Sequence, residues 1–254
     1  MLGLYDLNEC TNLGYRERLE IYKSVGFDEV ALYLDSNYNR PEENYVDIIK
    51  YARSIGLAIN QVHIDYKIAN SICDDSTSIY FDYIREKLEE SESLQIPYIV
   101  THASKGDTPP KITQLGLSRL SQTMREFENR DVYLCIENVR NNSNLDKIIS
   151  LGLQNVAVCF DVGHAHCYSN EYSLFKKLKS HIRCSHIHNN NGEDTHNTPF
   201  EGEIDCKYFT ARLSKIEGTS NCLECYPPRG HKLDKSAFIA FVEKLYSDSK
   251  KLEK

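Results

Sequence analysis

Residues 156–164 read VAVCFDVGH, a short apolar run that ends in an acid and is followed by a histidine. Because the run is apolar at consecutive positions, it is typical of a strand in a parallel sheet covered on both faces. Similar runs recur along the whole chain, and we expect eight strands in all. They lie at residues 2–5, 29–34, 57–63, 97–102, 132–137, 155–161, 182–188 and 221–225.

The segments between these runs carry apolar residues at helical spacing, and Asp234 stands where it can cap the last helix. The clearest positions are Tyr15, Leu19 and Tyr22, then Phe81, Ile84 and Leu88, then Leu117, Leu120, Met124 and Phe127, and finally Phe238, Phe241 and Leu245. Alternating strands and helices over 254 residues predict an α/β fold, a single (β/α)8 TIM barrel. An open doubly wound sheet is the alternative, but residues 6–14 lack its Gly-rich first turn. We expect the barrel to span residues 1–248, with a frayed tail at 249–254.

The composition is that of an ordinary globular protein, with a net charge of −7. This charge disfavours nucleic acid as a partner, and no apolar stretch is long enough to predict a membrane span. The beginning of the chain has no signal-peptide pattern. The nine cysteines are an odd number, and four of them (Cys135, Cys159, Cys184 and Cys222) lie inside apolar runs. We therefore expect buried thiols, no disulfide framework and a cytoplasmic location.

Ligand-type side chains stand at the ends of these runs or in the loops that follow. They are His63, His102, Glu137, Asp161, His164, His186, Asp194, His196 and Glu224. The carboxyl ends of the strands in such a barrel form one face, so these nine residues predict one convergent metal site. Mixed nitrogen and oxygen donors suit zinc, manganese, iron or cobalt and argue against calcium. His164 and four further side chains are candidates for contacts with a substrate: His188, Tyr66, Lys105 and Arg229.

Three segments resemble the xylose isomerase-like TIM-barrel superfamily. They are VCFDVGHAH at 158–166, CSHIHNNNGEDTHNTPFEGEID at 184–205 and LECYPP at 223–228. The superfamily includes sugar phosphate isomerases and epimerases, dehydratases of the inosose type, and endonuclease IV of AP endonuclease family 2. The resemblance covers nearly the whole chain and supports the barrel.

The two branches of the superfamily imply different uses of the nine residues. In the isomerase and epimerase branch, Glu137, Asp161, His186 and Glu224 would hold one zinc or manganese ion, which stabilises an enediolate. Glu137 and Glu224 would also be the catalytic acid and base. In the endonuclease branch the same four would hold one zinc. His63, His102 and Glu137 would then hold a second zinc, and His164, Asp194 and His196 a third.

The acidic composition leads us to expect a metal-dependent isomerase or epimerase acting on a sugar, a sugar phosphate or a polyol ketone. One departure weakens this expectation: the epimerase pattern has an arginine where this chain has Gly192. A three-zinc phosphoester hydrolase is the first alternative, and a non-catalytic barrel that binds sugar or metal is the second. A homodimer is compatible with the sequence.

Overall fold

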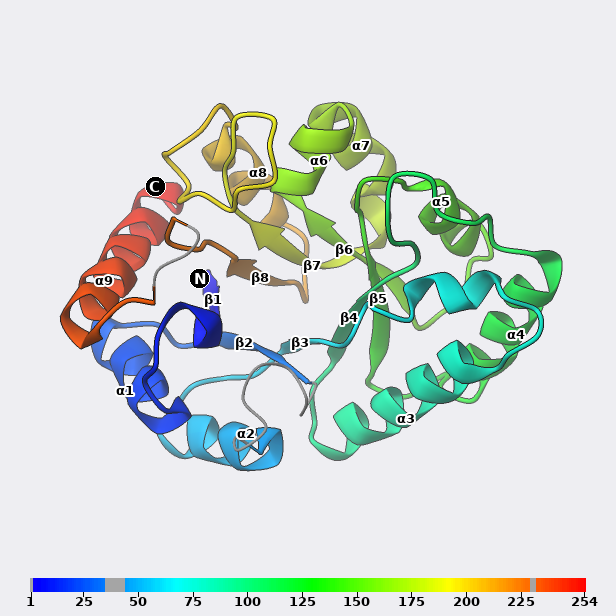
Figure 1. The fold of residues 1–254 in the computed structure, drawn as a ribbon, viewed down its shortest axis with the longest axis horizontal. Helices are drawn as coiled ribbons and strands as arrows, with labels where there is room; N and C mark the ends of the chain where they lie inside the picture. Colours follow the sequence, from blue (N-terminus) through cyan, green and yellow to red (C-terminus); the bar gives the residue numbers. More distant parts are fainter. Residues whose placement is uncertain (1, 35–43, 229–231) are drawn as a thin grey trace.

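Eight parallel strands close into one barrel in the order β1 to β8 (Figure 1). The computed structural model describes residues 2–34, 44–228 and 232–254. The strands are β1 (Gly3–Tyr5), β2 (Val30–Tyr33), β3 (Gln61–His63), β4 (Tyr98–His102), β5 (Tyr133–Glu137), β6 (Val156–Asp161), β7 (Ile182–Ile187) and β8 (Ser220–Leu223). The predicted (β/α)8 barrel is confirmed.

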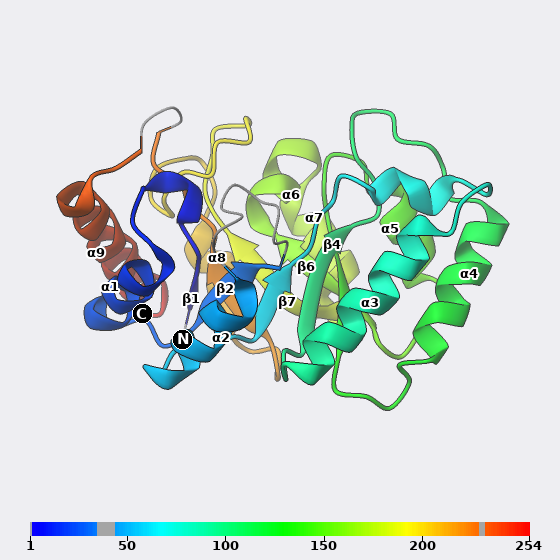
Figure 2. The same cartoon turned by 60° about the horizontal axis from the view of Figure 1, so that its bottom comes forward.

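Helices surround the barrel on its outside (Figures 1 and 2). They are α1 (Tyr15–Val25), α2 (Tyr45–Ser54), α3 (Ile79–Ser93), α4 (Gln114–Arg125), α5 (Ser143–Ile149), α6 (Val162–Tyr168), α7 (Glu171–Leu178), α8 (Cys206–Leu213) and α9 (Lys235–Leu252). Short 3₁₀ helices lie at Asn8–Cys10, Ala69–Cys73 and Lys179–His181. Within the described residues, no helix is both long enough and apolar enough to cross a membrane.

The last helix differs from the expectation at its carboxyl end. Asp234 caps it as predicted, because its Oδ1 accepts a hydrogen bond from the backbone nitrogen of Ala237 at 2.9 Å. The helix then continues through Leu252, so the expected frayed tail at 249–254 is helical over most of its length. The buried side chains of Ser249 and Leu252 explain why these residues stay ordered.

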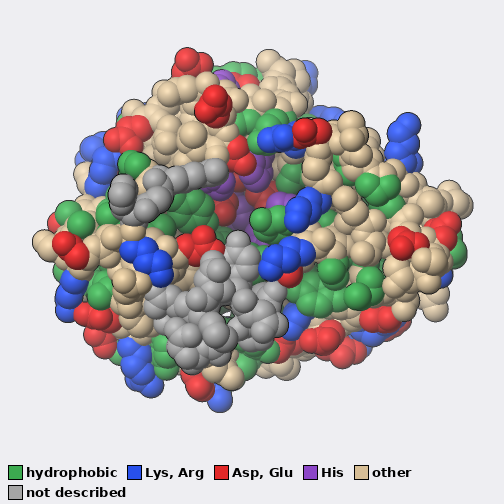
Figure 3. Space-filling model, in the orientation of Figure 1, with side chains coloured by type: hydrophobic (Ala, Val, Ile, Leu, Met, Phe, Trp, Pro, Cys, Tyr) green, Lys and Arg blue, Asp and Glu red, His purple; other side chains and the backbone are tan. Residues whose placement is uncertain are grey.

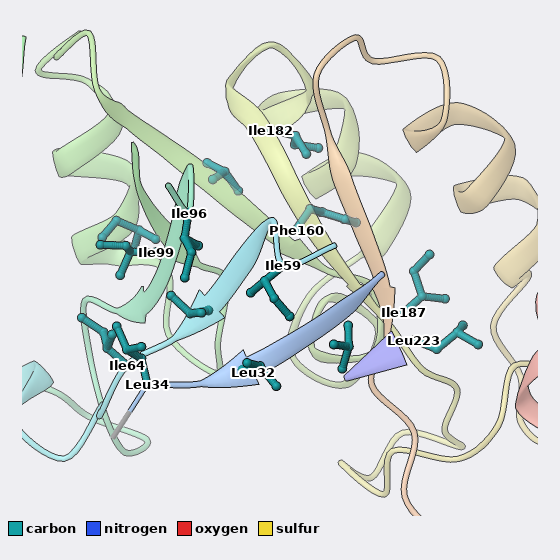
Figure 4. Packing of buried hydrophobic residues seen from close by; sticks show 14 of the residues in the cluster. Leu32, Leu34, Ile59, Ile64, Ile96, Ile99, Phe160, Ile182, Ile187 and Leu223 are labelled. Carbon is teal, nitrogen blue, oxygen red and sulfur yellow. The ribbon is translucent and has the colours of Figure 1, made fainter. Parts of the chain in front are cut away.

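The core has two layers on the two sides of the strands. Outward-facing residues such as Phe160, Ile182 and Leu223 pack in the layer between barrel and helices (Figure 4). Inside the barrel, Cys135, Cys159 and Cys184 pack with Val100 and Ala157. Cys222 packs with Tyr5 and Ala31, also as a buried residue. The prediction that these four cysteines are buried is confirmed. This packed interior supports the open face at the carboxyl ends of the strands, where functional side chains gather.

Candidate metal centre

The nine predicted ligands come together in three groups at the carboxyl ends of the strands. Within each group, one ligand atom from each residue lies within 4.8 Å of the others. The groups are His63, His102 and Glu137; Glu137, Asp161, His186 and Glu224; and His164, His188, Asp194 and His196. We call them the first, second and third groups. Glu137 belongs to two of them, and His188 is an addition to the predicted set.

The second group lies deepest and draws its members from β5, β6, β7 and the end of β8. His186 Nδ1 lies 3.1 Å from Glu137 Oε1 and 2.9 Å from Glu224 Oε2. Asp161 Oδ2 is 4.0 Å from the same nitrogen and accepts no hydrogen bond from any described residue, although Asp161 is fully buried. A buried carboxylate oxygen without a donor costs free energy unless a cation compensates for it. This oxygen therefore fits a metal ligand.

The first group uses the other oxygen of Glu137. His63 Nε2 lies 3.2 Å from Glu137 Oε2, and His102 Nε2 lies 2.9 Å from the same oxygen. Glu137 is 2% exposed, so both of its oxygens are committed to buried partners. Glu137 could therefore serve as a ligand in both groups, one oxygen to each.

The third group lies nearer the surface, where α6 meets the loop after β7. His164 Nε2 is 3.4 Å from Asp194 Oδ2, and His196 Nε2 is 3.2 Å from Asp194 Oδ1. An antiparallel bridge between Asn189 and Asn197 closes the base of the loop that carries Asp194 and His196. The loop is thereby held against the barrel rim.

The histidines are oriented by their second ring nitrogen. Four of the five predicted histidine ligands direct that nitrogen at a backbone carbonyl or amide oxygen. The contacts are His63 Nδ1 to the Ile64 carbonyl (2.8 Å), His164 Nδ1 to the Asn138 carbonyl (3.1 Å), His186 Nε2 to Gln61 Oε1 (3.2 Å) and His196 Nδ1 to the Glu224 carbonyl (2.9 Å). Because a carbonyl oxygen can only accept, the nitrogen that faces it carries the proton. The other nitrogen then faces the centre and, once deprotonated, could offer its lone pair to an ion, as metal-ligating histidines do.

Charges within the centre shift the pKa values of its members in opposite directions. Burial opposes ionisation of Glu137, but the imidazoles of His186, His102 and His164 outweigh it and hold the pKa of Glu137 well below its usual range. Burial likewise opposes protonation of His196, yet contacts with carboxylates raise the pKa of His196 to about 9. The centre therefore combines ionised carboxylates with three imidazoles, those of His164, His186 and His196, whose pKa values the carboxylates raise. Divalent ions could take the place of those protons.

A cavity of about 800 Å³ opens over the three groups. Figure 3 shows histidine and acidic side chains at the bottom of this hollow, with basic side chains beside it. Tyr66 and Lys105, two of the predicted substrate contacts, line the cavity, as does His164. His188 is fully buried and is not among the described residues that line the cavity, so it has no surface to offer a substrate. Arg229 lies outside the described residues.

Several buried polar residues support the ligands but were not predicted. Asn138 donates through Nδ2 to the Asp161 carbonyl at 2.8 Å, and its Oδ1 accepts from the Asp161 nitrogen at 2.8 Å. Gln61 donates to Ser220 Oγ at 3.0 Å and thereby holds its own oxygen toward His186. The Tyr226 hydroxyl donates to Glu224 Oε1 at 3.2 Å. Asn138 and Tyr226 stand one and two residues after ligands, which was the available signal.

These donors fit a divalent ion of the zinc or manganese type. Imidazole nitrogens and carboxylate oxygens make up all three groups, and no thiolate joins them among the described residues. Such mixed sets suit first-row transition metals rather than calcium. Cys222 and Cys225, the pair at C-x-x-C spacing, pack in different hydrophobic clusters and are buried strand and loop residues.

Comparison with known proteins gives one family and several similar folds. The family model described as "Xylose isomerase-like TIM barrel" matches residues 19–239. Uncharacterized protein MJ1614 of Methanocaldococcus jannaschii is 30% identical over 150 residues, 54% of this chain and 58% of that protein. The chain therefore matches somewhat more than half the length of this relative.

Among solved structures, similarity extends over nearly the whole chain. D-psicose 3-epimerase from Clostridium cellulolyticum H10 gives a TM-score of 0.75 at 14% identity, covering 98% of each chain. L-ribulose 3-epimerase gives 0.73 at 14% identity, covering 99% of this chain and 96% of its own. A sugar phosphate isomerase/epimerase from Parabacteroides distasonis gives 0.67 at 14% identity, covering 97% and 96%. At these identities the likeness is one of fold.

Proposed function

Because the chain belongs to the xylose isomerase-like TIM-barrel family, we propose that it is a metal-dependent enzyme that hydrolyses phosphoesters with three divalent ions. The sequence alone favoured the sugar isomerase or epimerase over the hydrolase, and this proposal reverses that order. The observation that carries it is the convergence of all nine predicted ligands into three groups, two of which share Glu137.

The reversal rests on the five predicted ligands outside the second group, beginning with His63 and His102. One ion in the second group would need only Glu137, Asp161, His186 and Glu224. His63 and His102 nevertheless direct Nε2 at one oxygen of Glu137, at 3.2 and 2.9 Å. Side chains that contact a neutral sugar would instead direct their polar atoms into the cavity. These two are directed at a carboxylate, which is the arrangement that a second ion requires.

The third group supports the same conclusion independently. Asp194 and His196 come from the loop after β7 and His164 comes from α6, yet both histidines approach Asp194 through Nε2. Their Nδ1 atoms are already used by backbone carbonyls. Three donors of this kind leave a coordination position open to a substrate oxygen, as catalytic sites do.

When bound, such ions supply Lewis acidity to a phosphoryl oxygen and lower the pKa of a water molecule toward neutrality. The residues of the chain hold and orient the centre, and the rim of the cavity can select an anion. Lys105 is exposed at the rim, with Nζ 5.5 Å from the centroid of the Tyr66 ring. A lysine beside an aromatic face offers a charge to a phosphate and a stacking surface to its organic group.

The test is hydrolysis of bis(p-nitrophenyl) phosphate and of a duplex that contains an abasic site, with zinc- or manganese-loaded protein. We expect His102→Asn and Asp194→Asn to lower the rate about a hundredfold or more, since an ion contributes several kcal/mol to such a step. His166→Gln is the matched control, because His166 pairs with Glu171 at 3.3 Å and belongs to none of the groups. Full activity in the first two variants, or no activity in the loaded wild type, would overturn the proposal.

A metal-dependent sugar isomerase or epimerase is the second candidate, favoured by one observation. Glu137 Oε1 and Glu224 Oε2 approach the same His186 nitrogen at 3.1 and 2.9 Å. Two carboxylates placed together in this way could act as acid and base on one substrate carbon. Under this hypothesis Glu137→Gln abolishes solvent deuterium exchange into a ketose, while Asp194→Asn retains it. The two candidates therefore make opposite predictions for Asp194→Asn.

A further inference from the structure

His188 stands immediately after β7 and is the one member of the three groups that the sequence did not place among the ligands. Its side chain is fully buried. Neither ring nitrogen makes a hydrogen bond with a described residue. Burying an imidazole in this way costs free energy relative to one whose nitrogens are hydrogen-bonded. An apolar side chain would fill the same space without that cost, so the imidazole needs a reason beyond packing.

Two neighbours supply that reason. His188 Nε2 lies 3.1 Å from Asp161 Oδ1, which is an ion-pair distance. The ring of His188 also stacks on the ring of His196, with centroids 3.8 Å apart and planes inclined by 12°. Asp161 belongs to the second group and His196 to the third. His188 therefore contacts one ligand in each of two groups.

The stacked geometry argues against His188 as a ligand itself. A ring nitrogen offers its lone pair in the plane of the ring. The rings of His188 and His196 are nearly parallel, so the lone pairs of their nitrogens lie in two parallel planes. In this arrangement they cannot point at the same ion. His196 already directs Nε2 toward Asp194 at 3.2 Å. The stacked ring behind it is thus placed to support His196 rather than to share its ion.

The two oxygens of the Asp161 carboxylate have different surroundings. Oδ1 accepts a hydrogen bond from the His164 nitrogen at 2.6 Å and also lies next to His188 Nε2. Oδ2 accepts none from the described residues. The hydrogen bond from the His164 nitrogen and the charge contact with His188 Nε2 both act on Oδ1 and restrict rotation of the carboxylate, while Oδ2 lies on the side of the second group. Outer contacts of this kind orient metal-ligating carboxylates.

The sequence provides space for this ring at Gly163. A Cβ atom there would lie 1.9 Å from His188 Cε1, so the ring packs directly against the glycine backbone at the start of α6. That helix carries His164, and Asp161 is its N-cap residue. His188 is therefore wedged between α6 and His196, with little freedom to move.

We propose that His188 is a positioning residue that couples the second and third groups, holding Asp161 through its Nε2 atom and His196 through its ring face. The inference rests on the proposed metal centre but not on the reaction performed there. It assigns separate tasks to two parts of one side chain, so variants can separate them. His188→Phe keeps an aromatic face and loses the nitrogen. His188→Gln keeps a nitrogen at similar reach and loses the face.

The experiment is a cobalt(II) titration of the metal-free protein followed by visible absorption, which needs no substrate. Bands lost in Asp161→Asn identify the second group, and bands lost in Asp194→Asn identify the third. We expect His188→Phe to weaken binding at the second group about 10–100-fold and to spare the third. We expect His188→Gln to do the reverse. His166→Gln is the control, and circular dichroism verifies that each variant is folded.

The outcomes separate the possible failures. Two variants that titrate like the wild type, or that weaken both groups equally, would overturn the positioning role. If His188→Phe does not fold, His188→Gln alone still decides: an unchanged third group contradicts the proposal. If the wild type binds no cobalt, the proposed metal centre itself is wrong, whatever His188 does.

Discussion

Replacing Glu137 by Gln tests the arrangement of the centre most directly, because Glu137 serves two groups at once. Its Oε2 faces His63 and His102, and its Oε1 faces His186. Gln keeps the shape of the side chain but removes the negative charge. A change in an outer contact already weakens metal binding about 10–100-fold, or ~1.4–2.7 kcal/mol. Loss of a charged ligand should weaken both groups by at least that much.

The structure therefore predicts a graded loss of ions. At a free zinc concentration of about ten times the Kd of the wild-type sites, we expect three ions per wild-type chain, one for each group. His102→Asn and Asp194→Asn each remove one group and should retain two ions. Glu137→Gln affects two groups and should retain one. Elemental analysis after dialysis measures the count, and circular dichroism reports whether each variant is folded.

Glu203→Gln is the matched control, because Glu203 is an exposed acid on the loop after β7 and belongs to none of the groups. It should keep the wild-type count. If Glu137→Gln retains as many ions as His102→Asn, Glu137 is not shared between the two groups. If the wild type holds one ion, the second group alone is used, and the isomerase becomes the better hypothesis.

Three further predictions concern stability. Zinc present at a hundredfold its Kd contributes about 2.7 kcal/mol for each ion bound to the folded protein. Removing it with a chelator should therefore lower the midpoint of thermal unfolding, followed by circular dichroism, by roughly 5–10 °C for each ion. Equal midpoints with and without the chelator would show that the folded protein binds no zinc. Gly163→Ala should destabilise the protein by about 1–3 kcal/mol in urea unfolding, because its Cβ would lie 1.9 Å from His188, whereas Gly14→Ala, with no atom within 4 Å, should change little. Burial raises the pKa of Glu29, so the folded state binds this proton more tightly than the unfolded state, and stability is lost as the pH rises above the unfolded value of about 4.3. Glu29→Gln should therefore be more stable than the wild type at pH 7 and nearly equal to it at pH 4, and lower stability at pH 7 would refute this.

The ends of the strands were predictable because the residues change character there. The runs of β4, β5 and β6 end at His102, Glu137 and Asp161 in the structure, as the sequence predicts. Polar side chains at those points lie at the carboxyl end of the barrel, where Glu137 and Asp161 are buried against histidines. The start of β3 was less predictable. The apolar run begins at residue 57, but the strand begins at Gln61, because Ala58 pairs with Glu29 only through an isolated bridge.

The support around the ligands was not predictable from sequence. Gln61 and Ser220 form a hydrogen bond across 159 positions of the chain, and no local pattern signals such a pair. His188 illustrates the same difficulty. Its position two residues after His186 suggested that it faces the substrate. It is buried instead, because Gly163 provides space for the ring and the loop carrying His196 covers it.

Net charge is a weak guide to the choice between the two activities for a physical reason. The value of −7 sums the whole chain and includes four carboxylates of the centre: Glu137, Asp161, Asp194 and Glu224. Three divalent ions would offset six of those seven net charges. The acidic composition then reflects the capacity to hold cations as much as the surface presented to a substrate. A charge argument against an anionic substrate holds for the metal-free chain and loses most of its force for the loaded one. Affinity for a phosphate-bearing substrate should therefore rise with each ion bound, which a sugar isomerase that uses one ion would not show.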